Sequence, residues 1–75
     1  MVSLNLAEKN YYQNVVKRRA LNAPSGVVFK ARWLFDKDHP VSARICRRFF
    51  EEVSIGMIPN ITKNGTRSRD GYTVL

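Results

Sequence analysis

Residues 42–54 read SARICRRFFEEVS, which is the pattern of an amphipathic helix. Ser42 is a residue type that caps helix N-termini by accepting a hydrogen bond from the backbone. Ile45, Phe49 and Val53 then recur at helical spacing and form an apolar stripe that continues through its neighbours. The spacing predicts one helix over 42–54 with these three side chains buried.

The charged residues of this helix fall outside its stripe. Arg44, Arg47 and Arg48 occupy the first two turns, and Glu51 and Glu52 occupy the last. The helix dipole favours the reverse order, so dipole stabilisation does not account for the arginines. We expect them to face outward and to bind a partner. The structural alternative is a solvated face with Arg–Glu pairs at i,i+4 spacing, each worth only tenths of a kcal/mol.

The chain before this segment begins with a second predicted helix, from Asn5 to about Asn22. Asn5 can cap it, and Glu8 stands three residues on, as a capping box requires. The expected apolar stripe consists of Leu4, Ala7, Tyr11 and Val15, with Tyr12 and Val16 one position across. Residues 22–26 (NAPSG) then end the helix.

Residues 27–35 (VVFKARWLF) fit either a strand or a helix. Alternation favours a strand, while Ser25 as a possible cap favours a helix. We leave this choice open. Phe29, Trp33 and Phe35 are expected in the core, as large aromatics usually are; stacking on single-stranded bases is the alternative.

The C-terminal third predicts a β-hairpin over residues 57–75. Residues 57–63 are compatible with a strand, Asn64-Gly65 is a hairpin signal, and Asp70-Gly71 precedes a closing strand at 72–75. The loop between the strands is polar and basic. Its cations are Lys63, Arg67 and Arg69.

Length and composition place these elements in one domain. The chain has 75 residues, 44% of them hydrophobic, which is enough for a core and argues against disorder. The predicted fold is a small α+β domain of two to three helices followed by a C-terminal β-hairpin. There are 13 Lys and Arg against 6 Asp and Glu, a net charge of +7, which attracts polyanions or an acidic partner. The basic groups are residues 17–19, Lys30 and Arg32 with Lys37 nearby, Arg44 with Arg47 and Arg48, and Lys63 with Arg67 and Arg69.

Several functions lack the residues that they need. Cys46 is the only cysteine and His39 the only histidine, so we expect no disulfide, no metal, no cofactor and no catalytic site. Cys46 lies on the apolar stripe and is expected to be a core residue. The first residues include no apolar stretch of signal-peptide length, and no segment is long enough to span a membrane. We therefore expect a cytoplasmic protein that has no membrane partner.

The basic helix and hairpin resemble a known class of DNA-binding domain. The helix at 42–54, then residues 56–59 (GMIP) and, after the basic loop, residues 71–74 (GYTV), look like the recognition helix and wing of winged-helix proteins. Within that group the stretch is similar to the small excisionases of temperate phages. The resemblance implies a DNA-bending factor that directs a recombinase, or a related phage regulator. It covers roughly the last 35 residues and departs from the pattern in a longer wing and a longer N-terminal part.

These observations predict a sequence-specific DNA-binding regulator or recombination directionality factor with a helix-turn-helix type of recognition. Arg44, Arg47 and Arg48 are the expected major-groove residues, and Lys63, Arg67 and Arg69 the wing residues. The expected partner is double-stranded DNA, with a recombinase or a second copy of the chain as further partners. The alternatives are an RNA-binding module that uses residues 27–35 as an aromatic platform, and a basic interaction protein that docks on an acidic partner.

Overall fold

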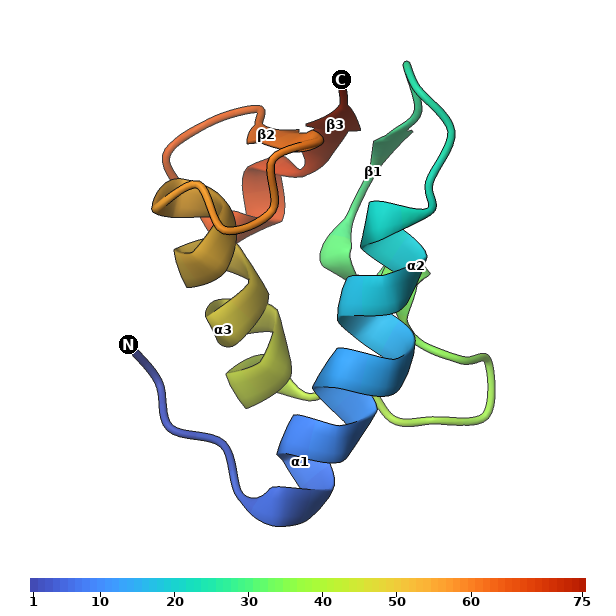
Figure 1. The fold of residues 1–75 in the computed structure, drawn as a ribbon, viewed down its shortest axis with the longest axis vertical. Coiled ribbons are helices and arrows are strands. Elements are labelled where there is room, and N and C mark those ends of the chain that lie inside the picture. The colour runs from blue at the N-terminus through green and yellow to red at the C-terminus, as the bar shows by residue number, and fades with distance from the viewer.

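The computed structural model describes residues 1–75 as a small α+β domain (Figure 1). One long N-terminal helix consists of α1 (Leu6–Tyr11), a π-helical turn η1 (Tyr12–Val16) and α2 (Lys17–Leu21). A short strand β1 (Val28–Phe29) and a 3-10 turn η2 (Ala31–Leu34) lead to the second helix, α3 (Ala43–Ser54). The chain ends in β2 (Ile61–Lys63), a 3-10 turn η3 (Ser68–Asp70) and β3 (Tyr72–Val74).

The N-terminal helix begins with the predicted capping box. Asn5 accepts a hydrogen bond from the Glu8 backbone N–H at 2.8 Å, and Glu8 accepts one from the Asn5 backbone N–H at 2.9 Å. The π-helical turn was not predicted, and it changes which side chains the helix buries. Tyr12, Val16 and Ala20 are buried, whereas the predicted stripe member Ala7 is exposed.

Residues 27–35 contain both of the alternatives that the sequence left open. Val28 and Phe29 form a strand, and the chain then turns into η2. Phe29 and Phe35 are buried, as predicted. Trp33 was expected in the core, and this was wrong, because its side chain lies on the surface with 45% of its area exposed.

Helix α3 has the predicted bounds and cap. Ser42 accepts a hydrogen bond from the Ile45 backbone N–H at 3.2 Å, and Ile45, Phe49 and Val53 are buried. The outward placement expected for Glu52 was wrong. Glu52 is only 2% exposed, because the buried face of α3 is wider than its apolar stripe and meets a polar group of the N-terminal helix.

The three strands form one antiparallel sheet in the order β1-β3-β2. Phe29 lies opposite Tyr72 in one strand pair, and Lys63 lies opposite Tyr72 in the other. The predicted hairpin is present, but Asn64-Gly65 opens an irregular loop instead of a two-residue turn. This loop runs from residue 64 to residue 71 and includes η3. The Phe29, Phe49 and Tyr72 rings pack together, with Phe49 and Tyr72 centroids 4.8 Å apart, and join the sheet to α3.

Candidate nucleic-acid interface

Ion pairs divide the basic residues of this chain into two populations. Five of the 13 Lys and Arg side chains form ion pairs with carboxylates. The cations that form none are Lys9, Arg18, Lys30, Arg32, Lys37, Lys63, Arg67 and Arg69. Five of these eight cations lie at η2 or in the hairpin, and the other three are distributed over α1, α2 and the loop after η2.

Two arginines of α3 turn toward the N-terminal segment. Arg44 lies 3.1 Å from a Glu8 carboxylate oxygen and also donates a hydrogen bond to the Ser3 carbonyl. Arg48 donates to the Val2 carbonyl at 3.0 Å and is half-buried. Arg44 and Arg48 thus hold residues 1–5 against α3, and only Arg44 keeps more than half of its side-chain surface exposed.

Arg48 also belongs to a buried charged cluster that joins the two helices. Glu52 receives hydrogen bonds from Arg48 Nε at 2.8 Å and from the Tyr12 hydroxyl at 2.8 Å, and the Lys17 ammonium lies 3.4 Å away. Burial alone would raise the pKa of Glu52, but these hydrogen bonds and nearby positive charges outweigh it and hold that pKa below its ordinary value. The tyrosine pKa is raised, mainly by burial and then by the bond to Glu52. This cluster serves the packing of the helices.

Arg47 is the most exposed of the three arginines of α3. Its side chain is 74% exposed, and its one carboxylate neighbour, Glu51, lies at 3.9 Å, the limit of an ion pair. Ala43, one turn earlier on α3, is exposed too. The N-terminal half of α3 therefore exposes Ala43, the paired Arg44 and the more open Arg47, and no acidic residue occupies its first turn.

The hairpin brings its three predicted cations to the same side of the molecule as Arg47. Lys63 Nζ lies 4.7 Å from the centroid of the Phe50 ring of α3, a cation–π contact. Arg67 and Arg69 are exposed on the loop. Asp70 is the one acid of this loop, and it accepts a hydrogen bond from the Arg67 backbone N–H at 3.0 Å.

Two further cations, which the predicted site did not include, complete this surface. Lys30 and Arg32 are exposed at η2, and Lys30 Nζ donates to the Arg69 carbonyl at 2.5 Å, so that η2 adjoins the hairpin loop. The sequence did group these two residues among the basic clusters, but only the β1–β3 pairing places them beside the loop. We call the resulting surface the basic face. It consists of Lys30, Arg32, Arg47, Lys63, Arg67 and Arg69.

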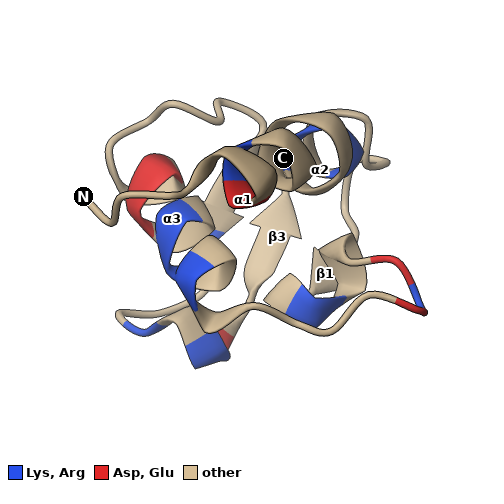
Figure 2. Ribbon diagram, turned by 90° about the horizontal axis from the view of Figure 1, so that it is seen from below, with Lys and Arg blue, Asp and Glu red and all other residues tan.

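In Figure 2, the basic segments beside β1 and in the hairpin loop lie opposite the α1–α2 helix, and those of α3 lie between this side and α1. Cys46 lies within this surface and lines two shallow hollows, one shared with Arg47 and Ser68 and the other with Lys30 and Arg69. Cys46 is half-buried rather than a core residue, and burial raises the pKa of its thiol. The six cations thus follow one continuous surface.

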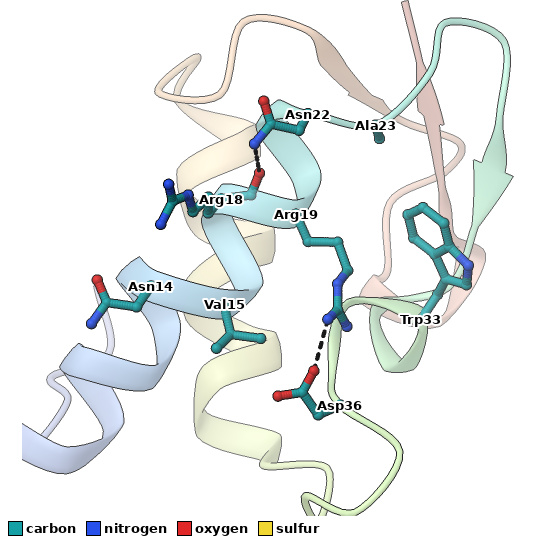
Figure 3. Close-up of a pocket in the computed structure, with 8 residues that line it drawn as sticks. All are labelled: Asn14, Val15, Arg18, Arg19, Asn22, Ala23, Trp33 and Asp36. Atoms are coloured by element: carbon teal, nitrogen blue, oxygen red, sulfur yellow. Dashed lines mark hydrogen bonds and ion pairs between the residues drawn. The ribbon is translucent and has the colours of Figure 1, made fainter.

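A different hollow lies between α2 and η2 (Figure 3). Arg19 crosses it to Asp36, with 2.7 Å between the charged atoms, while Arg18 points away toward solvent. Trp33 forms its far wall and thereby stands between this hollow and the basic face.

No three His, Cys, Asp or Glu side chains lie together in a group that could hold a metal ion. Neither helix is long and apolar enough to span a bilayer. The sequence matches no family model, no curated protein and no solved structure.

Proposed function

We propose that this chain is a winged-helix-like domain that binds double-stranded DNA. The N-terminal half of α3 would lie in the major groove, and the hairpin loop would lie along the adjacent backbone as the wing. The observation that carries this proposal is the basic face, where five cations have no carboxylate partner and the sixth, Arg47, has only a distant one. A surface that serves only solubility would intersperse acids among these cations.

The element order supports the same proposal. Helix α3 is preceded by a turn and followed directly by a hairpin, and β1 joins this hairpin to the rest of the domain. The N-terminus of α3 has the positive end of the helix dipole and no acid in its first turn, which suits phosphate oxygens. Arg47 is the proposed base-reading residue, because Arg44 is paired with Glu8 and bonded to the Ser3 carbonyl. Arg48 is committed to Glu52 and stays outside the proposed interface.

The resemblance to small excisionases gives a narrower form of this hypothesis, a regulator or recombination directionality factor that bends its site. A gel-shift assay with circularly permuted fragments tests it, because a bend changes mobility according to its position in the fragment. Equal mobility of all permuted complexes would leave DNA binding in place and remove the bending role.

The first test of the proposal is the salt dependence of duplex binding. If about five of the six cations neutralise phosphates, the logarithm of the affinity should fall with the logarithm of salt concentration at a slope of about −4 to −5. Fluorescence anisotropy with a labelled duplex of about 20 base pairs, from low to physiological salt, measures this slope. An affinity that hardly changes with salt would contradict the proposal and favour an acidic protein partner.

Matched substitutions separate base reading from backbone contact. Arg47→Ala should cost about 1–3 kcal/mol and relax the preference at one base position. Arg67→Ala should weaken binding to all sequences and reduce the salt slope by about one. Arg18→Ala is the control, because it removes the same charge from an exposed, unpaired arginine on α2, outside the basic face. If Arg18→Ala weakened binding as much as Arg67→Ala, net charge alone would explain the affinity.

A further inference from the structure

Trp33 is the one tryptophan of the chain, and the structure leaves 45% of it exposed. Its ring packs on the buried Phe29 ring, with 5.3 Å between the centroids and 39° between the planes. The indole is therefore held in place on one side and open on others. Val28, which lines the same hollow, is 68% exposed, so the indole belongs to an apolar patch on which a partner can bind.

The hollow beside Trp33 has an apolar floor and a cationic rim. Val28, Phe29 and Trp33 supply its apolar lining, and Lys30 and Arg32 stand around it without ion pairs. Gly71 closes another side, where a Cβ atom would lie only 3.0 Å from the Phe29 carbonyl oxygen. The Gly71 backbone thus lies close to the Phe29 backbone, and a side chain at position 71 would press against the Phe29 carbonyl.

One acid, Asp70, borders this hollow, and its carboxylate is already bonded within its own loop. The Asp70 carboxylate accepts the Arg67 backbone N–H and lies directly beside Gly65. The charge that remains around the indole is positive and continuous with the basic face, because Lys30 contacts the Arg69 carbonyl. An occupant with a flat apolar body and a negative group matches both features.

We propose that Trp33 is a stacking platform for an unpaired nucleobase of the DNA that the basic face holds. The base would stack on the exposed indole, and its phosphate would lie against Lys30 and Arg32. The inference rests on the proposed function and adds a substrate preference to it, for duplexes that carry a single-stranded or extrahelical nucleotide over continuous duplexes. Stacking of bases on aromatic side chains tolerates every base, since each has a π face.

The experiment uses the intrinsic fluorescence of Trp33 in the full chain. A continuous duplex is compared with a duplex of the same phosphate number that has a three-nucleotide single-stranded end. The expected result is tighter binding and stronger quenching with the single-stranded end. Trp33→Ala should weaken binding to that DNA about tenfold to a hundredfold and leave binding to the continuous duplex within about twofold.

Two further variants control for folding and for apolar surface. Trp33→Phe keeps an aromatic platform against Phe29 and should retain most of the preference. Leu21→Ala removes an apolar side chain at the end of α2 that is 46% exposed, against 45% for Trp33. It should change the affinity for neither the continuous duplex nor the duplex with the single-stranded end. Circular dichroism of each variant confirms that it is folded.

The outcomes distinguish this inference from the function on which it rests. Salt-dependent binding of both duplexes with equal affinity and no quenching would overturn the stacking site and leave the proposed function standing. No binding of either duplex at low salt would overturn the proposed function. A native dimer in sedimentation that Trp33→Ala converts to monomer would show that a second copy covers the indole, and would overturn the stacking site as well.

Discussion

Two buried tyrosine hydroxyls of this chain have opposite surroundings. The Tyr12 hydroxyl donates a hydrogen bond to Glu52, whereas the Tyr72 hydroxyl is buried with no hydrogen-bond partner. A buried hydroxyl without a partner has lost its bonds to water and gained nothing in exchange. The same atom therefore stabilises the fold at one position and opposes it at the other.

Tyr12→Phe and Tyr72→Phe should consequently change stability in different directions. The first removes a hydrogen bond to a charged group and should cost about 1.5–3 kcal/mol. The second removes only the unpaired hydroxyl and should leave the free energy of unfolding unchanged or slightly higher. Urea unfolding of both variants at neutral pH measures the difference. Equal losses in the two variants would mean that the Tyr72 hydroxyl has a partner after all.

Glu52 predicts how stability depends on acid pH. Burial raises its pKa, but the bonds from Arg48 and Tyr12 and the charge of Lys17 together lower it below 4.5, its ordinary value. Because the unfolded chain takes up this proton first as the pH falls, the contribution of Glu52 is fully present above about pH 4.5 and disappears as the pH falls through the lower, folded pKa. The free energy of unfolding should decrease over that window.

The Glu52→Gln variant tests this assignment. It has no proton to gain there, so its free energy of unfolding should depend less steeply on pH below 4.5 than that of the wild type. Glu51→Gln, at the adjacent position of α3, is the matched control, because it removes a carboxylate that bonds neither Arg48 nor Tyr12. Parallel curves for wild type and Glu52→Gln in urea titrations between pH 3 and 6 would contradict the role of this carboxylate.

At the scale of elements, the π-helical turn η1 sets the register of the N-terminal helix. The Lys17 backbone N–H donates to the Tyr12 carbonyl, five residues earlier, so this turn accommodates an extra residue. With that residue in place, Tyr12, Val16 and Ala20 all face the core. Without it, every residue before the turn would rotate by about 100° about the helix axis.

Deleting Gln13, an exposed residue of η1, should therefore destabilise the domain by more than about 2 kcal/mol, although the shortened segment could form a regular α-helix. Tyr12 would turn away from Glu52, and Glu8 would turn away from Arg44. Gln13→Ala keeps the register and should stay within about 0.5 kcal/mol of wild type. Thermal unfolding by circular dichroism distinguishes them. A deletion variant as stable as Gln13→Ala would show that η1 is not needed for the packing.

The elements that the sequence predicted well are those that depend on neighbouring residues. The caps at Asn5 and Ser42 and the stripe of α3 act within one or two turns, and each is present as predicted. Strand β1 exists only because Val28 and Phe29 pair with Thr73 and Tyr72, more than forty residues away. No local pattern contains that pairing, and so residues 27–35 stayed ambiguous.

The site shows the same division. The exposure of Arg47 and of the hairpin cations follows from local pattern. The diversion of Arg44 to Glu8 and of Arg48 to the Val2 carbonyl depends on where residues 1–8 lie, and the helix pattern does not contain that information. The prediction that Trp33 is buried failed for a similar reason. Trp33 lies in the turn η2, and the position of this turn depends on β1.

At the scale of the whole molecule, the distribution of the ion pairs decides which part of the surface keeps an excess of positive charge. Three of the six acids, Glu8, Asp36 and Glu52, are paired with cations outside the basic face, whereas the six cations of that face have only Asp70 and the more distant Glu51. Because five of the eight unpaired cations lie on this face, we expect the centre of positive charge to be displaced toward it, which would give the molecule an electric dipole. A polyanion exerts a torque on such a dipole before any surfaces touch. The domain would arrive already turned toward its partner, and this alignment would raise the rate of association while leaving the lifetime of the complex to the few contacts made afterwards.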